Sequence, residues 1–281
     1  MQKMLEFVKM QATGNDFIMA DARQLDMDWG KTAARMCDRH LGVGADGLMA
    51  VMVSAVADLR MRLFNADGSE AQISGNGLRC FAKYAVDRKL VKGPAISIET
   101  LAGIKHIETV ATGGRVVQAR VNMGRPVLSA ADIPVTVKAK GPVLEHRLPV
   151  GGRELEMAFV SMGNPHAVCF IDGDVDGFPL HEMGPLVEHH SIFPQRTNFE
   201  IVNRVGRDKL RARVWERGVG ETLACGSGSS ATAVAARLKG YIGDKVDITM
   251  PGGVLSVNWD GEGDVFLQGP VEEVFTGVYP L

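Results

Sequence analysis

The sequence predicts an α/β (α+β) protein with two pseudo-symmetric domains, each a mixed sheet curled around a central helix, and an active site in the cleft between them. Three observations lead to this prediction. One segment occurs twice, about 150 residues apart, as FNADGSEAQISGNGLRCFAKYAV from Phe64 and as WERGVGETLACGSGSSATAVAAR from Trp215. Each copy contains a G-x-G that opens an apolar helix, and short strand-like segments with Gly turns fill most of the remaining chain.

The first half begins with a strand at residues 5–10, ahead of a Gly-Asn turn. A helix is predicted over 28–40 from the spacing of its apolar residues, and the alternation of apolar and polar residues in 59–64 predicts a strand. A helix from about 78 to 88 follows the glycine-rich segment. Residues 95–121 are expected to form a run of short strands joined by Gly turns.

The second half repeats this order. Residues 127–150 are expected to form short strands, residues 209–215 alternate like a strand, and the Ala- and Val-rich segment after Cys225 predicts a helix closed by Gly240. That helix lacks a broad polar face, which is typical of a buried helix. The last 35 or so residues are expected to form strands separated by PGG, DGEGD and QGP turns.

The domain boundaries follow from the repeat. We expect one domain to comprise residues 1–124 plus about 270–281 and the other to comprise residues 125–269, with GRPV at 124–127 as the crossover. A length of 281 residues suits two domains of ordinary size.

The composition, with 46% hydrophobic and 23% charged residues, is that of a soluble globular protein. A net charge of -2 gives no reason to expect nucleic acid or an anionic membrane as a partner. The longest apolar stretch, 48–57, is far shorter than the roughly 20 residues of a membrane helix. Four cysteines show no metal-ligand spacing, so no metal is expected and a reducing cytoplasm is the expected location.

The repeated motif points to chemistry at two helix ends. When the copies are aligned, Ser74 corresponds to Cys225, and the Gly14-Asn15 pair corresponds to Gly163-Asn164 with nearly the same offset. A helix N-terminus carries unpaired N–H groups and partial positive charge, and two such ends would hold a carboxylate. A thiol there should have its pKa lowered from about 8.5. We therefore expect abstraction of an amino acid's α-proton on one face and proton delivery to the other.

Simpler explanations compete with this hypothesis. A lone cysteine is more often core than catalytic, and a lone serine is an ordinary N-cap. Cys37, Cys80 and Cys169 are best explained as core residues, and His166 alone fits a solvated loop histidine equally well. The GxGxxG match at residues 42–47 follows a predicted helix rather than a strand, which is the wrong context for nucleotide binding.

Nine ordered motifs resemble those of the diaminopimelate epimerase family: TGNDF, HLGVGADG, FNADGSE, SGNGLRC, SMGNPH, RTNFE, WERGVGET, ACGSG and PGG. The resemblance spans nearly the whole chain. It implies a cofactor-independent isomerase, without pyridoxal phosphate or metal, that interconverts LL- and meso-diaminopimelate on the route to lysine and peptidoglycan. It also implies a small diamino dicarboxylate substrate, two pseudo-symmetric domains and a homodimer.

The resemblance also implies site residues. Cys225 and Ser74 would be the catalytic pair, and His166 and Glu216 would tune the pKa of the pair. An Arg can grip a carboxylate as a fork, and Asn side chains can bind both ammonium and carboxylate groups. The implied substrate-binding residues are Asn15, Asn65, Gly75, Asn76, Asn164, Asn198, Glu216, Arg217, Gly226 and Ser227.

This chain departs from the family pattern at two positions. Ser74 stands where the family has its first catalytic cysteine, and Gly47 stands where some members have Gln. A serine hydroxyl is a weak base without help. Ser74 could be a substitution that traps a complex, a natural variant that still works but slowly, or a sign of drift to another reaction. The alternatives are a same-fold amino-acid racemase or dehydratase that uses Ser74 and Cys225, and a catalytically disabled amino-acid-binding variant.

Overall fold

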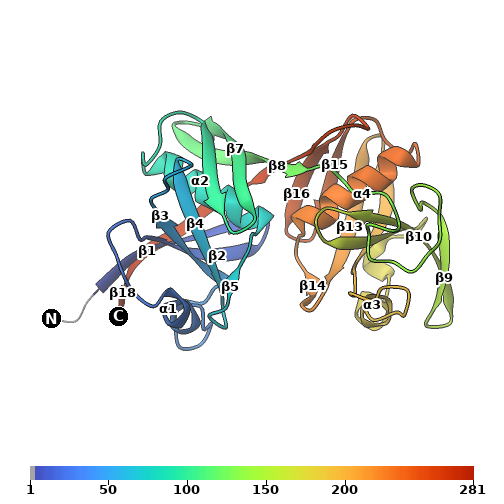
Figure 1. Cartoon of the computed structure of the whole chain (residues 1–281), viewed down its shortest axis with the longest axis horizontal. Coiled ribbons are helices and arrows are strands. Elements are labelled where there is room, and N and C mark those ends of the chain that lie inside the picture. The colour runs from blue at the N-terminus through green and yellow to red at the C-terminus, as the bar shows by residue number, and fades with distance from the viewer. Residues whose placement is uncertain (1–3) are drawn as a thin grey trace. The chain divides into compact units, whose positions relative to one another are not determined.

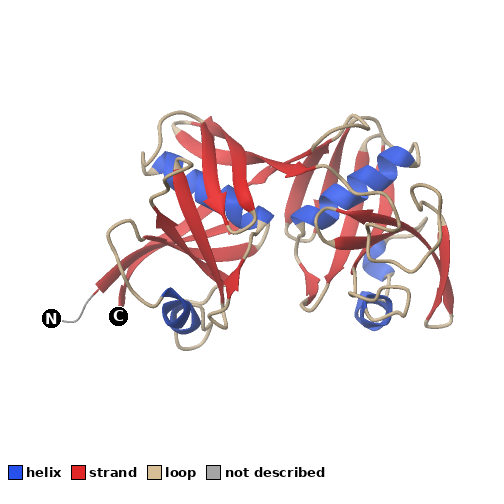
Figure 2. Ribbon diagram, viewed as in Figure 1, coloured by secondary structure: helices blue, strands red, loops and turns tan. Residues whose placement is uncertain are grey.

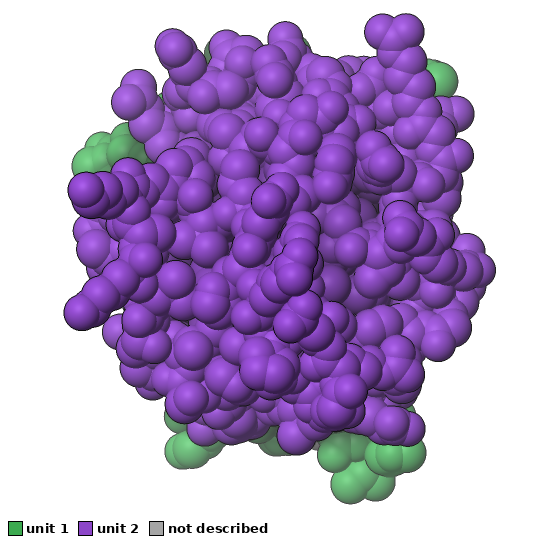
Figure 3. All heavy atoms as spheres, turned by 90° about the vertical axis from the view of Figure 1, so that its right-hand side faces the viewer, with its two compact units in different colours: residues 1–122, 268–281 green, residues 123–267 purple. Residues whose placement is uncertain are grey.

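The protein, described by a computed structural model over residues 4–281, divides into two units (Figure 3). Unit 1 comprises residues 1–122 and 268–281, and unit 2 comprises residues 123–267. Unit 1 is therefore built from two separate stretches of the chain, whereas unit 2 is continuous.

Unit 1 holds two helices and a set of short strands (Figure 1). Its elements are β1 (Met4–Ala12), β2 (Asn15–Asp21), α1 (Trp29–Met36), β3 (Gly47–Met52), β4 (Leu59–Asn65), β5 (Glu70–Ala71), α2 (Gly75–Asp87), β6 (Ala95–Thr100), β7 (Gly103–Thr112), most of β8 (Arg115–Gly124) and β18 (Glu272–Pro280).

The elements of unit 2 are β9 (His146–Val150), β10 (Arg153–Ser161), β11 (Pro165–Phe170), the 3-10 turn η1 (Val175–Gly177), α3 (Leu180–Glu188), β12 (Asn198–Gly206), β13 (Lys209–Glu216), β14 (Gly220–Thr222), α4 (Gly226–Leu238), β15 (Lys245–Met250), β16 (Gly253–Asn258) and most of β17 (Val265–Pro270). From β10 to β17, unit 2 repeats the element order of β1 to β8, with η1 added, and β9 precedes this series.

The strand pairing is the same in both units. The β2 strand runs parallel to β3, and β11 runs parallel to β12. Next along each sheet, β4 is antiparallel to β3 and parallel to β6, while β13 is antiparallel to β12 and parallel to β15. Even the register agrees, because Phe17 pairs with Gly47 in unit 1 and His166 pairs with Asn198 in unit 2.

A central helix lies among the strands of each unit, α2 in unit 1 and α4 in unit 2 (Figure 2). The α4 helix is rich in Ala and Ser, and ten of its residues are buried. It packs against buried strand residues that include Val168, Val202 and Ile248. Small side chains let strands approach the helix on most of its circumference, which explains the missing polar face.

The opposite sheet face is also covered. Successive strand residues point to opposite faces, so in unit 2 Val168 contacts the α4 core while Ala167 and Cys169 belong to a second core with Met183 and Val187 of α3. In unit 1 the helix α1 packs in the same way, with Trp29 and Met36 in a core with Ile18 and Leu48. Strands buried on both faces explain the continuous apolar runs of β3 and β11.

The predicted fold class, α/β (α+β), is confirmed, and the strands predicted at 5–10, 59–64 and 209–215 are present. Two helix bounds were wrong. The helix predicted over 28–40 ends at Met36, since Cys37 caps it and Asp38 receives the backbone N–H groups of the next turn. The helix expected from about residue 78 starts at Gly75, because Ser74 caps it.

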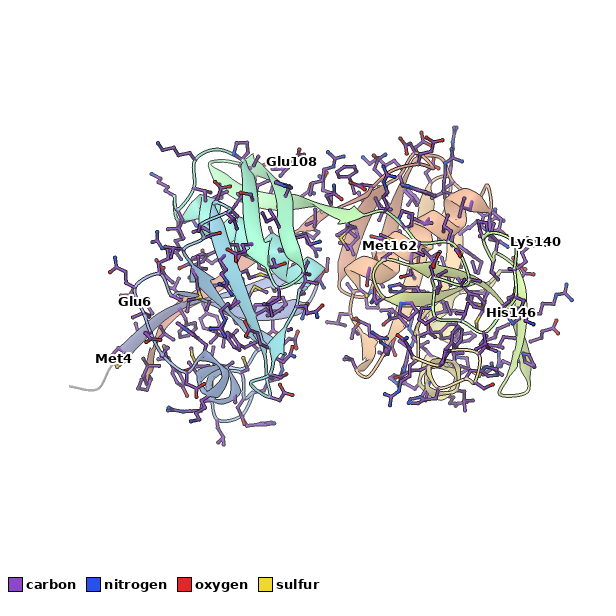
Figure 4. The ribbon with its side chains drawn as sticks, viewed as in Figure 1. Met4, Glu6, Glu108, Lys140, His146 and Met162 are labelled. Atoms are coloured by element: carbon purple, nitrogen blue, oxygen red, sulfur yellow. The ribbon has the colours of Figure 1, made fainter. Side chains whose placement is uncertain are left out.

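Of the run of short strands predicted for 127–150, only β9 is present. Before β9, residues 125–145 form only isolated bridges, Val127 with Ser161 and Ser129 with Pro142. The three prolines of this stretch remove ladder donors. Its Lys140, labelled in Figure 4, is exposed. Near the end of the chain, QGP lies within β17 rather than in a turn.

Candidate active site

Ser74 and Cys225 occupy the same position in their units, the N-cap of the central helix. Their backbones match closely, with φ −138° and ψ 124° at Ser74 and φ −126° and ψ 119° at Cys225. Ser74 Oγ accepts the N–H of Gly77 at 3.1 Å, and Cys225 Sγ accepts the N–H of Gly228 at 3.4 Å. Each side chain is thereby held beside the first-turn N–H groups, where a helix attracts anions.

A side chain lies directly beneath the second glycine of each motif. A Cβ at Gly228 would lie 2.7 Å from Glu200 Oε1, and a Cβ at Gly77 would lie 2.0 Å from the Cε of Met49. These glycines therefore let the helix start come close to the neighbouring strand. Glu200 and Met49 occupy equivalent places, as the strand pairs Val168–Glu200 and Met19–Met49 also indicate.

His166 lies in β11 and is buried, so the expectation of a solvated loop histidine was wrong. Its Nδ1 is 2.7 Å from Glu200 Oε1, and both side chains are fully buried. The strand residues that flank His166 are apolar and buried, and Glu200 on the neighbouring strand β12 provides one polar contact of the ring. Burial raises the pKa of Glu200, while the nearby His166 opposes this increase.

Glu200 is a polar site residue that the sequence prediction missed. It is the last residue of the RTNFE motif and stands within NFEIV, where the neighbouring residues are apolar and buried. A carboxylate in an otherwise apolar strand is rarely buried without a partner. That signal was present in the sequence and indicated a buried polar pair.

Hydrogen bonds continue from His166 to Cys225. His166 Nε2 is 3.0 Å from Asn164 Oδ1, and the Asn164 amide donates to Ser227 Oγ at 3.3 Å. Ser227 Oγ lies 3.5 Å from Cys225 Sγ. The structure thus brings together four of the predicted site residues in unit 2, with Glu200 at the far end.

The prediction of a lowered thiol pKa at Cys225 was wrong. Burial raises the pKa of the Cys225 thiol well above its usual value, and the carboxylates of Glu216 and Glu200 raise it further. The hydrogen bonds from Ser227 and from the Gly228 N–H act in the opposite direction but do not outweigh burial. This shift keeps the thiol protonated near neutral pH.

Unit 1 has the equivalent strand pairing but different side chains at the equivalent positions. Phe17 and Met49 stand at the positions of His166 and Glu200, so the side chains behind Ser74 at these positions are apolar. Asn15 Nδ2 donates to Asp46 Oδ2 at 2.5 Å, and Asn15 Oδ1 accepts from Asn76 Nδ2 at 3.4 Å. The asparagine pair holds the turn before β2 against the start of α2.

Asn198 and Glu216 lie on neighbouring strands in unit 2. Asn198 is buried and spans two backbone groups, accepting the N–H of Arg217 at 2.9 Å and donating to the carbonyl of Pro165 at 2.9 Å. Glu216 accepts the hydroxyl hydrogen of Thr222 at 2.5 Å. These contacts fix both side chains near the start of the turn that follows β13.

The exposed candidates are Arg217 and Asn65, each just beyond or at the end of a strand. Arg217 donates to the carbonyl of Gln195 at 3.0 Å, and Asn65 donates to Ser69 at 3.0 Å. Gly47 lies opposite Asn65 in the sheet, and a Cβ there would lie 2.7 Å from the carbonyl oxygen of Phe64. This backbone therefore has no room for a side chain at residue 47.

The other cysteines are core residues, as expected. Cys37, Cys80 and Cys169 are buried free thiols, and burial raises the pKa of each to about 12. Within residues 4–281, no three His, Cys, Asp or Glu side chains are grouped to hold a metal ion, and no helix is long and apolar enough to cross a membrane. A surface hollow of unit 1, lined by Leu5, Phe7, Tyr84 and Arg88 among others, contains none of the predicted site residues.

The fold of this chain, with its duplicated α/β frame, is also found in solved structures. Solved structures with this fold include a PhzF-family phenazine biosynthesis protein from Bacillus anthracis (TM-score 0.70, 17% identity, covering 99% of this chain and 100% of that one). Another is a probable proline racemase from Agrobacterium radiobacter (TM-score 0.68, 14% identity, covering 99% and 92%).

Sequence comparison gives the particular family. The family model described as diaminopimelate epimerase matches residues 7–129 and 158–274. The diaminopimelate epimerase of Moorella thermoacetica is 45% identical over 99% of this chain and 100% of its own length, and that of Desulforudis audaxviator is 48% identical over 97% and 98%. The chain belongs to the diaminopimelate epimerase family.

Proposed function

We propose that this protein is an isomerase that interconverts LL- and meso-diaminopimelate, a small diamino dicarboxylate; its relatives are named diaminopimelate epimerase. The observation that carries the proposal is the repeated N-cap geometry of Ser74 and Cys225 in a chain of this family. The proposal requires both caps to act on one substrate α-carbon, one on each face. It also takes the two units as the two domains of the enzyme.

In this mechanism the helix starts at Gly75-Asn76 and Gly226-Ser227 hold the α-carboxylate, whose negative charge grows as the α-proton leaves. Cys225 is protonated in the free protein, so it is suited to deliver a proton to the α-carbon. For the reverse transfer it must first ionise, and the hydrogen bonds from Ser227 and Gly228 then stabilise the thiolate.

Ser74 takes the place of the second acid–base group. Its hydroxyl holds its proton far more tightly than a thiol, and Phe17 and Met49 supply no base behind it. Epimerisation should therefore be slow. A positioned general acid or base contributes about 10²–10⁴-fold to a rate, which sets the scale of the expected deficit.

The proposed contacts to the rest of the substrate involve the asparagines and the Glu216-Arg217 pair. Arg217 is exposed and its guanidinium donates to a backbone carbonyl, from which it can turn to grip the distal carboxylate with two hydrogen bonds. The amide groups assigned to the ammonium and carboxylate groups are those of Asn15, Asn65, Asn76, Asn164 and Asn198.

A second candidate function has specific support. The apolar residues behind Ser74 favour an enzyme in which only Cys225 exchanges a proton, so that one face of the substrate reacts and the stereocentre does not invert. A disabled amino-acid-binding variant would exchange no proton at all.

Deuterium incorporation from D2O into LL- and meso-diaminopimelate tests the proposal. The wild-type protein, Ser74→Cys and Cys225→Ala should be compared under the same conditions. Slow incorporation into both isomers by the wild type, with none by Cys225→Ala, is the expected result. Deuterium incorporation into one isomer only would support the enzyme in which only Cys225 exchanges a proton. If neither the wild type nor Ser74→Cys exchanges either isomer, diaminopimelate is not the substrate.

We further propose that the protein is cytoplasmic and forms a homodimer. The free, buried cysteines suit a reducing compartment. On β18 the apolar side chains of Val274, Phe275 and Val278 are about half exposed, which gives a second copy an apolar surface to cover. Light scattering coupled to size-exclusion chromatography gives the mass in solution, and a monomer mass at all concentrations would contradict the dimer.

A further inference from the structure

The hydrogen bonds that start at Glu200 have one consistent direction. The side-chain oxygen of Asn164 is only an acceptor, so His166 Nε2 must carry the hydrogen between them. The Asn164 amide then donates to Ser227 Oγ. Because Ser227 has accepted this hydrogen, its own hydrogen is available for Cys225 Sγ.

Glu200 determines the direction of these hydrogen bonds through the first of them, the one to His166. An isolated neutral imidazole can carry its hydrogen on either nitrogen. If Glu200 is protonated, it donates to His166 Nδ1 and the imidazole hydrogen stays on Nε2. In that state Nε2 is a donor toward Asn164, and burial, which raises the pKa of Glu200, favours it.

We propose that Glu200 is a positioning residue for Cys225: through His166 and Asn164 it holds the Ser227 hydroxyl as a hydrogen-bond donor to the Cys225 sulfur. The inference deepens the proposed function, because the donor would stabilise the thiolate that must form in one half of each catalytic cycle. Its test needs no substrate, so it can succeed or fail independently of that function.

Unit 1 has the equivalent strands and helix without the hydrogen-bonded Glu200–His166 pair. At the two corresponding positions unit 1 has Phe17 and Met49, and both units fold around the same strand pairs. A charged or polar pair is therefore not needed to build the sheet beneath the helix start. Its presence behind the sulfur, and its replacement by apolar residues behind the oxygen, point to a role at Cys225.

A direct electrostatic effect of the Glu200 carboxylate on Cys225 would change the thiol pKa in the opposite direction. The charged groups that act on Cys225 through space are Glu216 on β13 and Glu200 on β12, and His166 on β11 contacts Glu200. Through space the Glu200 carboxylate disfavours a thiolate, so its simple removal would make Cys225 more acidic. Loss of the oriented hydroxyl donor would make Cys225 less acidic. The sign of the change distinguishes the two effects.

The experiment measures the rate at which iodoacetamide alkylates Cys225 near pH 8 and across the alkaline range, with the modified peptide identified by mass spectrometry. Ser227→Ala should slow alkylation about tenfold, which corresponds to one unit of thiol pKa. This variant removes atoms next to the sulfur, so poorer access cannot explain a slower reaction. Glu200→Met, which installs the unit 1 residue, should slow alkylation to a similar extent.

Two further variants distinguish the effect of the oriented Ser227 hydroxyl from the effect of the Glu200 charge. Glu200→Gln can still donate to His166 Nδ1 and should stay within about twofold of the wild-type rate. The double variant Glu200→Met/Ser227→Ala should be no slower than Ser227→Ala, because both changes act on one donor. Wild-type or faster alkylation of Glu200→Met would overturn the proposal, as would a Glu200→Gln protein as slow as Glu200→Met.

Glu200→Met leaves His166 buried without its partner and can lower the stability of the fold. His166→Phe/Glu200→Met recreates the apolar pair of unit 1 and serves as the second test, with unfolding by urea as the check on folding. We expect the same tenfold slowing in this double variant. Wild-type reactivity in a folded His166→Phe/Glu200→Met protein would also overturn the proposal.

Discussion

Ser74 and Cys225 cap equivalent helices with nearly equal backbone angles, and their side chains accept the same N–H group of the first turn. The difference lies in one atom and in what lies behind it. The sulfur is linked to a buried imidazole and carboxylate, whereas the oxygen has Phe17 and Met49 at the equivalent places. Chemically the two halves are therefore unequal, although their frames match.

Replacing Ser74 by Cys should raise the rate of epimerisation. A thiol ionises far more readily than a hydroxyl, and the N-cap position already places it beside first-turn N–H groups. We expect the rate of interconversion of the two isomers to rise about 10²–10⁴-fold, the range for a positioned acid–base group. Polarimetry or a coupled assay of meso-diaminopimelate measures this rate.

Ser74→Ala is the matched control, since it removes the hydroxyl and keeps the backbone. Interconversion should be lost in Ser74→Ala while Cys225-dependent deuterium exchange from one isomer persists. Equal rates in wild type, Ser74→Cys and Ser74→Ala would show that residue 74 takes no part in proton transfer.

At the residue scale, the sequence allowed the two cap residues to be singled out, because the repeat aligns Ser74 with Cys225. It did not reveal the raised pKa of the Cys225 thiol, which depends on burial and on two carboxylates brought close by folding. Nor did it place His166 in a buried strand. These properties depend on which strands become neighbours.

The α3 helix is one of the elements that the sequence analysis did not predict. Gly184 and Pro185 lie inside it, and both residues normally argue against a helix. Tertiary packing stabilises it, since Met183 and Val187 join the core that contains Phe199 and Ile201. The repeat contained the missing signal, because Leu180 follows Trp29, the start of α1, by the same distance as Gly226 follows Gly75.

At Gly184 the α3 helix packs closely against Trp215 of β13. A Cβ at Gly184 would lie 2.4 Å from the Trp215 ring, which is held by its hydrogen bond to Glu188 at 2.8 Å. Alanine is the better helix former by about 1 kcal/mol, yet the clash should make Gly184→Ala less stable by about 1–3 kcal/mol. Urea unfolding measures this difference.

Gly173→Ala provides the comparison, since a Cβ there meets open space. It should unfold at nearly the wild-type urea concentration. A Gly184→Ala protein as stable as Gly173→Ala would mean that α3 does not pack against Trp215 as closely as described.

Across the whole molecule, four buried thiols link stability to pH. Burial raises the pKa of Cys37, Cys80 and Cys169 to about 12 and that of Cys225 well above its usual value. In the unfolded chain a thiol ionises near pH 8.5. The folded chain therefore binds more protons above that pH, so stability is complete below it and falls as pH rises.

We expect the free energy of unfolding to decrease by about 2–3 kcal/mol between pH 8 and pH 9 for four such thiols. Urea unfolding under reducing conditions measures the decrease. Arg79, whose pKa burial lowers to about 10, acts in the opposite sense only at higher pH. Cys169→Ala should show about three quarters of the wild-type decrease. A free energy of unfolding that is constant over this interval would contradict the expectation.

Unit 1 is closed by a strand that follows unit 2 along the chain. The β18 strand pairs with β1 from Met4–Pro280 to Gln11–Glu272, and the hydrogen bond between the Gln11 and Glu272 side chains joins residues 261 positions apart.

During refolding, unit 2 can assemble from continuous sequence, whereas unit 1 must wait for a loop that contains all of unit 2 to close. Trp29 lies in unit 1 and both Trp215 and Trp259 lie in unit 2, so fluorescence of single-tryptophan variants can time the units separately. The chain order and the order of assembly are then reversed: the domain that starts the sequence should be the last to become native.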